Sequence, residues 1–165
     1  MLSIKNRVII FNLVRDIPYR LSDSDHNTVC ISKAKLLGEF LVKSGLKCRV
    51  VKCLFDWKKQ NIGQEVIQSR IDLKESLSSE HTFLRVFIPE TKKWVNVDPT
   101  WDKGLKKVLS LATWDGINET ILAVSTEKIW LAKVSPFDLV CPNFDKNNHF
   151  VKTFNRWLKR SRQKI

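Results

Sequence analysis

The sequence lacks a long hydrophobic run. Its apolar stretch Val8–Phe11 is soon broken by Asn12, Arg15 and Asp16, so it is too short for a signal peptide and far too short to span a bilayer. An internal repeat and a low-complexity segment are also missing, which excludes repeat arrays and biased linkers. We therefore expect a soluble protein with no membrane partner.

Cysteine is sparse as well. The four cysteines, at positions 30, 48, 53 and 141 of 165 residues, fall short of the density of a secreted disulfide scaffold. We expect them to be reduced, in a cytoplasmic protein. Cys48 and Cys53 lack the paired short spacings of a zinc site, and we assign them to structural positions on a strand. The sequence predicts neither a metal nor a cofactor.

Acidic residues are outnumbered, because 17 Asp and Glu face 29 Lys and Arg to give a net charge of +12. Such a charge is compatible with an acidic protein or peptide substrate, and it leaves nucleic-acid binding open. The second interpretation is weak, since basic residues are spread along the chain and the one dense run lies at 152–164. A solvated helix face and tail is the more economical account of that run.

A helix beginning near Cys30 is the clearest local pattern. The polar loop 22–28 supplies turn and N-cap residues, and Gly45 is placed to end the helix. The apolar stripe at helical spacing consists of Ile31, Ala34, Leu36, Leu37, Phe40 and Leu41. A thiol is thus expected at a helix N-terminus.

The runs 81–88 and 94–98 predict a β-hairpin joined by 89–93. Pairing Ile88 with Lys93 gives the other face a coherent apolar layer, formed by Leu84, Val86, Ile88, Val95 and Val97. A slip of one residue would turn this layer to the wrong face.

The same register brings two chemically useful residues together. Phe83 then faces Asp98, and His81 lies diagonally from Asp98 on the same face, within side-chain reach. The apolar pattern and the proposed chemistry therefore favour one register.

The remaining segments complete an α+β chain. We expect helices over 4–14 and 148–162, the latter burying Phe150, Phe154, Trp157 and Leu158. Strands are expected at 49–55, 121–124 and 129–134. Residues 57–80 are predicted to be a polar insertion that borders a cleft, with an amphipathic helix through Val66, Ile67, Ile71 and Leu77. With 43% hydrophobic residues, residues 1–165 suffice for a single domain.

Cys30, His81 and Asp98 have the residue types of a nucleophilic triad. Unpaired amide N–H groups and the helix dipole favour the thiolate of Cys30. His81 would take the proton, and Asp98 would orient the imidazole. Three tryptophans, Trp57, Trp101 and Trp114, are candidates either for the walls of a groove or for core packing.

These residues sit in strings that resemble the transglutaminase-like superfamily. The string Cys30-x3-Ala34-x-Leu36-Leu37-x2-Phe40-Leu41-x3-Gly45-Leu46-x-Cys48-Arg49 is similar to that family's cysteine helix and following strand. His81-Thr82-Phe83 and Trp94-Val95-Asn96-Val97-Asp98-Pro99 resemble its histidine and aspartate strands. The likeness is strongest over residues 11–102.

The resemblance implies a papain-like core, in which the cysteine helix packs on an antiparallel sheet that carries the other two catalytic residues. It also implies a cysteine hydrolase or acyltransferase that acts on amide bonds through a thioester. Peptide or amide hydrolysis is our first hypothesis. Acyl transfer to an amine and an inactive basic binding module are the alternatives. No tryptophan precedes Cys30, whereas crosslinking members use one to help hold the oxyanion, and this difference favours hydrolysis.

Overall fold

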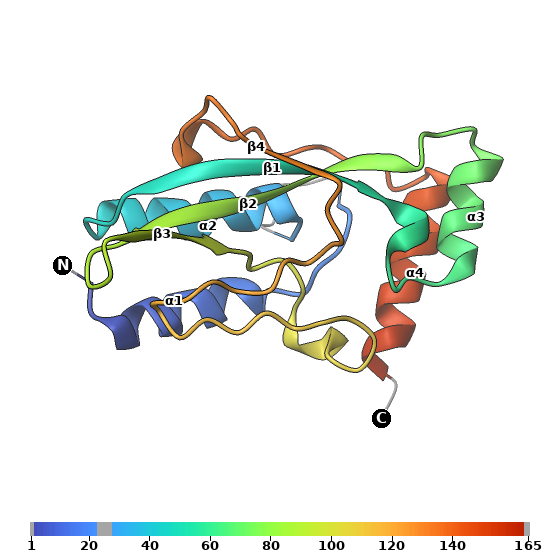
Figure 1. Cartoon of the computed structure of the whole chain (residues 1–165). Coiled ribbons are helices and arrows are strands. Elements are labelled where there is room, and N and C mark those ends of the chain that lie inside the picture. The colour runs from blue at the N-terminus through green and yellow to red at the C-terminus, as the bar shows by residue number, and fades with distance from the viewer. Residues whose placement is uncertain (1, 23–27, 164–165) are drawn as a thin grey trace.

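The computed structural model describes residues 2–22 and 28–163 (Figure 1). Over these residues the chain forms four helices and one four-stranded sheet. The helices are α1 (Ile4–Arg15), α2 (Cys30–Lys43), α3 (Gln64–Asp72) and α4 (His149–Gln163), and the strands are β1 (Cys48–Asp56), β2 (Ser78–Ile88), β3 (Lys93–Val97) and β4 (Lys128–Leu131). Short 3-10 turns are η1 (Trp57–Lys59), η2 (Lys103–Leu105) and η3 (Pro136–Asp138). The expectation of a mixed α and β fold is confirmed.

The sheet is antiparallel with strand order β3-β2-β1-β4. Ile88 pairs with Lys93 and Leu84 with Val97, which is the register predicted from the apolar alternation. The predicted apolar layer is buried, with exposed fractions of 6% or less for Leu84, Val86, Ile88, Val95 and Val97. That layer faces α2, which contacts β1 and β2 (Figure 1). The helix α1 packs against α2.

The helix α2 follows its predicted course. Ala34, Leu37 and Leu41 are fully buried against the sheet. Gly45 adopts a φ of 90°, a left-handed conformation that glycine adopts without steric cost. Its N–H donates to Val42 O at 2.9 Å, and the N–H of Leu46 donates to Leu41 O at 3.0 Å. Gly45 therefore ends the helix as expected.

A second apolar cluster lies at the end of the sheet where α3 and α4 pack side by side (Figure 1). The four predicted core residues of α4 are all buried: Phe150, Phe154, Trp157 and Leu158. Trp57 meets Phe154 edge-on, with ring centroids 5.4 Å apart. Because Cys30 packs against this cluster, the start of α2 lies where the two cores meet.

Two segment predictions are wrong. Residues 121–124 form neither helix nor strand; instead Leu122 and Val124 cover the sheet face that carries Val51, Cys53 and Phe83. The predicted helix in 57–80 is shorter than expected, since α3 ends at Asp72 and Ile71 is 43% exposed. In both segments tertiary packing, which local pattern does not encode, decides the outcome.

Candidate active site

Cys30 is the first residue of α2 and is partly buried. Its helix is capped from within, because Ser32 Oγ accepts the N–H of Val29 at 3.1 Å and donates to Val29 O at 3.0 Å. Residues 23–27 of the predicted capping loop lie outside the described part, and Thr28 Oγ1 donates to Arg20 O instead. The sulfur thus lies at the positive end of the helix, where a thiolate is favoured.

His81 and Asp98 meet as the register requires. His81 lies on β2 opposite Cys53 of β1, and Asp98 directly follows β3. His81 Nε2 lies 2.7 Å from Asp98 Oδ2, and the two residues are 2% and 0% exposed. The ring of Phe83, on the same strand face, stacks on His81 with centroids 5.9 Å apart. The imidazole is therefore held on one side by a buried carboxylate.

Asp98 is itself held by several donors. Thr100 donates its N–H and its hydroxyl to Oδ1 at 3.2 and 2.5 Å, and the N–H of Ala123 donates to Oδ2 at 2.8 Å. The N–H of Asp98 donates to Thr120 Oγ1 at 2.9 Å. Burial raises the pKa of Asp98, but His81 and these donors outweigh burial and bring it below 3.8. Asp98 is ionised at neutral pH.

Cys30 is the second partner of His81. A side-chain hydrogen bond joins the thiol and the imidazole, while Nε2 of His81 lies 2.7 Å from Asp98 Oδ2. Burial raises the pKa of the Cys30 thiol, but the hydrogen bond and charge of His81 outweigh it, so the pKa falls below 9.0. Burial lowers the pKa of His81, yet Asp98 and Cys30 raise it well above 6.5. Both shifts favour a thiolate beside an imidazolium.

Tyr19 also belongs to the site, although the sequence did not predict this role for it. Its hydroxyl lies beside Cys30, where it interacts with the backbone N–H and with the thiol. Burial, followed by the negative charges of Cys30 and Asp98, raises the pKa of Tyr19 well above 10.0. Tyr19 therefore remains a protonated donor next to the sulfur. Its ring is fixed by edge contacts with Trp101 at 4.7 Å and Phe154 at 6.3 Å.

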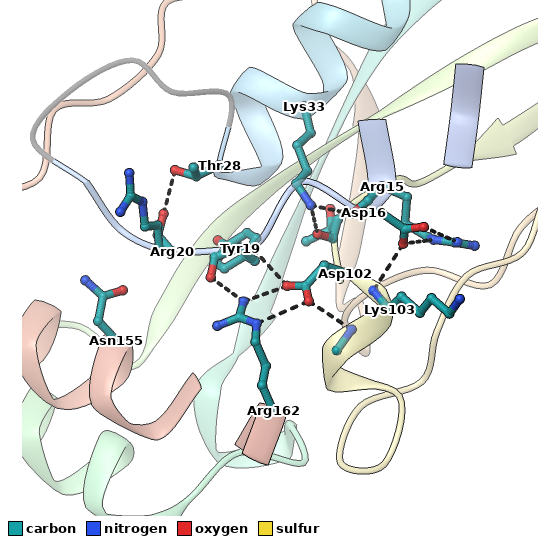
Figure 2. Close-up of polar contacts among 12 residues, drawn as sticks. Arg15, Asp16, Tyr19, Arg20, Thr28, Lys33, Asp102, Lys103, Asn155 and Arg162 are labelled. Carbon is teal, nitrogen blue, oxygen red and sulfur yellow. Dashed lines mark hydrogen bonds and ion pairs between the residues drawn. The ribbon is translucent and has the colours of Figure 1, made fainter. Parts of the chain in front are cut away.

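The backbone of Tyr19 is clamped by charged side chains (Figure 2). Asp102 Oδ2 accepts the N–H of Tyr19 at 2.8 Å, and Arg162 Nη2 of α4 donates to Tyr19 O at 2.6 Å. Arg162 also pairs with Asp102 at 2.6 Å. Lys33 of α2 enters the same region, where its Nζ donates to Arg15 O at 2.7 Å and to Thr100 O at 2.9 Å. The network ties the segment before the cysteine to α2 and α4.

Cys30 and His81 open into a cavity of about 160 Å³ with mostly apolar walls. Trp57 and Trp101 line this cavity, as do other residues of the 57–80 insertion, namely Ile62, Arg70, Ser79 and Glu80. The expectation that this insertion borders a cleft is therefore met. Trp114 is instead buried in the core beside Phe11. Arg70 stacks over Phe150 at 4.6 Å and pairs with Glu75 at 3.2 Å.

Cys48 and Cys53 differ chemically from Cys30. Burial raises the pKa of Cys48 to about 12, and burial likewise raises the pKa of Cys53. Both lie on β1, as predicted. In the described part of the chain no group of three His, Cys, Asp or Glu side chains is arranged to hold a metal ion. No helix within residues 2–22 and 28–163 has the length and apolar character needed to cross a membrane.

Comparisons with known proteins identify no relative. No family model, no curated protein and no solved structure matches the chain. The functional interpretation consequently depends on the geometry of the site and on the motifs described above.

Proposed function

We propose that this protein is a cysteine hydrolase of the transglutaminase-like type, with a papain-like core, that acts on amide bonds of a protein or peptide. The observation that carries the proposal is the row formed by Cys30, His81 and Asp98, three residues remote in sequence that meet beside one cavity. A row of this kind matches the roles of nucleophile, general acid–base and orienting carboxylate.

The proposed hydrolysis begins from the thiolate of Cys30 and the imidazolium of His81. The Cys30 thiolate attacks the amide carbonyl carbon, and the carbonyl oxygen becomes an oxyanion. The candidate oxyanion donors are the hydroxyl of Tyr19 and the N–H groups that follow Cys30 in the first turn of α2, since the N–H of Cys30 itself interacts with Tyr19. The imidazolium of His81 gives its proton to the leaving amine as the C–N bond breaks, which leaves a thioester on Cys30.

Water completes the cycle. Neutral His81 takes a proton from water, whose oxygen attacks the thioester carbonyl, and the acid leaves as the thiolate–imidazolium pair is restored. A primary amine in place of water would give acyl transfer instead. The cavity beside Cys30 is small, and the described basic side chains on its wall are His81 and Arg70, the latter paired with Glu75.

The proposal is tested by trapping the acyl-enzyme with a small activated ester and locating the adduct by mass spectrometry. We expect acylation at Cys30 in the wild type and in Cys48→Ala, a matched control that removes another thiol, whose pKa is shifted by burial alone. Cys30→Ala should fold, as judged by its thermal unfolding, but should neither acylate nor turn over.

Retained turnover in Cys30→Ala, or an adduct on another residue, would reject the assignment. Adding a primary amine to the trapped acyl-enzyme then compares the two second nucleophiles. Predominant release of the free acid supports hydrolysis, and predominant amide formation supports acyl transfer.

A further inference from the structure

A second hollow lies next to the catalytic cavity, along the edge of the sheet. It is a groove of about 520 Å³ lined by residues 130–134 and 138–140. Ile31 and Lys52 also line it. We refer to it as the edge groove.

The edge groove is continuous with the candidate active site. Ile31 directly follows Cys30 and lines both hollows. Lys52 of the groove pairs at 3.0 Å with Glu80, which lines the catalytic cavity. A chain lying in the groove therefore leads directly to the sulfur of Cys30.

The groove runs beside the free edge of a β-strand. β4 is the last strand in the sheet order, and within the described residues no further strand pairs with its outer edge. The N–H of Ala132 donates to Val50 O at 2.9 Å. Since hydrogen-bonded pairs alternate in an antiparallel ladder, residues 129 and 131 direct their backbone N–H and C=O groups away from β1. An outer edge of this kind is a template for an added strand.

The lining segment 138–140 is anchored to α2. Lys35 Nζ donates to Leu139 O at 3.0 Å. At Gly38 of α2 a Cβ atom would lie 2.6 Å from Pro136 Cβ, so η3 packs directly on the helix backbone. The groove is thus formed before any ligand arrives, which lowers the entropic cost of binding.

The surface of the groove combines apolar residues with charged ones. Leu131 and Val134 are each 44% exposed and Val140 is 84% exposed. The charged residues of the lining are Lys133, Asp138 and Lys52, the last of which is paired with Glu80. Lys133 is exposed, and so is Lys128, which lies on β4 outside the lining. Exposed apolar side chains that border a groove mark a binding surface, and the two exposed lysines of β4 and its continuation favour acidic side chains on the part of the ligand next to that strand.

We propose that the edge groove binds an extended, acidic and apolar segment of the substrate protein as an added strand on β4, and that this segment delivers the scissile amide to Cys30. The inference rests on the proposed function, because only a reactive Cys30 would cleave the bound segment. The binding itself can be measured without turnover. Alternating side chains of the added strand would point to opposite faces of the sheet.

The test is binding of a fluorescein-labelled octapeptide of alternating valine and glutamate to the Cys30→Ala protein, followed by fluorescence anisotropy. Two further peptides carry N-methyl groups on all valines or on all glutamates. We expect the parent peptide to bind and at least one methylated peptide to bind about tenfold more weakly, because it loses strand hydrogen bonds.

A pair of protein variants tests whether the peptide binds in the edge groove. Val140→Glu places a charge on the groove rim, whereas Leu13→Glu makes the same change at a 69% exposed position on α1. We expect Val140→Glu to weaken binding several-fold and Leu13→Glu to leave it unchanged. Absence of binding at millimolar protein, equal affinity for all three peptides, or equal effects of the two variants would overturn the proposal.

The experiments distinguish an error in the groove proposal from an error in the proposed function. If Cys30 is not a nucleophile, the wild type forms no acyl-enzyme, yet peptide binding to the groove is unaffected. If the groove is not used, acylation of Cys30 by a small ester proceeds while the peptide experiments fail.

Discussion

At the scale of single residues, the site depends on how Cys30 and His81 share one proton. Burial opposes charge on both groups, but the charge that each acquires stabilises the other. The Asp98 carboxylate adds a third charge that favours imidazolium. An ion pair between these groups would let a thiol in an aromatic pocket act as the proposed nucleophile near neutral pH.

This pairing predicts the pH dependence of Cys30 alkylation. We expect iodoacetamide to react with wild-type Cys30 with an inflection below pH 9, because His81 lowers the pKa of the thiol. In His81→Ala the lowering is lost while burial still raises the pKa, so the inflection should move upward past that of an ordinary thiol. The measurement is the alkylation rate against pH, read by mass spectrometry of the Cys30 peptide.

His149→Ala is the matched control for that experiment, because His149 is exposed at the start of α4. Its profile should coincide with the wild type. Identical profiles for His81→Ala and the wild type would contradict the pairing of thiol and imidazole.

The hydroxyl of Tyr19 makes a second prediction at this scale. Tyr19→Phe keeps the ring contacts with Trp101 and Phe154 but removes the donor beside Cys30. We expect kcat to fall by about 10²- to 10³-fold, as for the loss of one oxyanion donor, with little change in KM. Steady-state kinetics measure the change, and an unaltered melting temperature shows that the fold is intact. An unchanged or higher kcat would mean that the hydroxyl does not stabilise the oxyanion.

At the scale of elements, alternation in sequence was enough to predict the hairpin. A strand has a period of two, so only one register buries Leu84, Val86 and Val97 together. That register also sets His81 and Asp98 on one face. The apolar pattern and the proposed chemistry therefore predicted the same placement for two of the three proposed catalytic residues. Similarly, the apolar residues at helical spacing after Cys30 predicted α2.

Other parts of the site have no comparable signal. Ala123 binds Asp98 through its backbone N–H, a contact that any residue type except proline allows. Residues 121–124 have the composition of a strand, yet they cover the sheet instead of joining it. Tyr19 reaches Cys30 because α4, distant in sequence, fixes its backbone. Thr100 is the exception, since a threonine two residues after an aspartate is typical of a turn closed by the carboxylate.

At the scale of the whole molecule, one buried network joins segments that bear the site. Lys33 is fully buried and links the end of α1 to the segment after Asp98. Asp102 and Arg162 extend the network to Tyr19 and α4 (Figure 2). The helix that carries the proposed nucleophile is thereby coupled to both ends of the chain. We expect changes in this network to affect stability and catalysis together.

The buried amine of Lys33 predicts how the free energy of unfolding depends on pH. Burial lowers the pKa of Lys33 from 10.5 to about 7, and the carboxylates of Asp102 and Asp16 offset only part of this effect. Between these two values the unfolded chain binds more protons than the folded one. The free energy of unfolding should therefore rise with pH from about 7 to 10, by at most about 1.4 kcal/mol per pH unit from this group.

Lys33→Met removes that contribution while keeping a side chain of similar length. We expect the wild type to gain stability relative to Lys33→Met as the pH rises from 7 to 10, as measured by urea unfolding at several pH values. Lys43→Met, on an exposed position of the same helix, controls for the loss of one positive charge and should run parallel to the wild type. If Lys33→Met also ran parallel, Lys33 would be protonated throughout this range. In that case a permanent charge, held by two carbonyl oxygens and two nearby carboxylates, would join α1, α2 and the segment after Asp98.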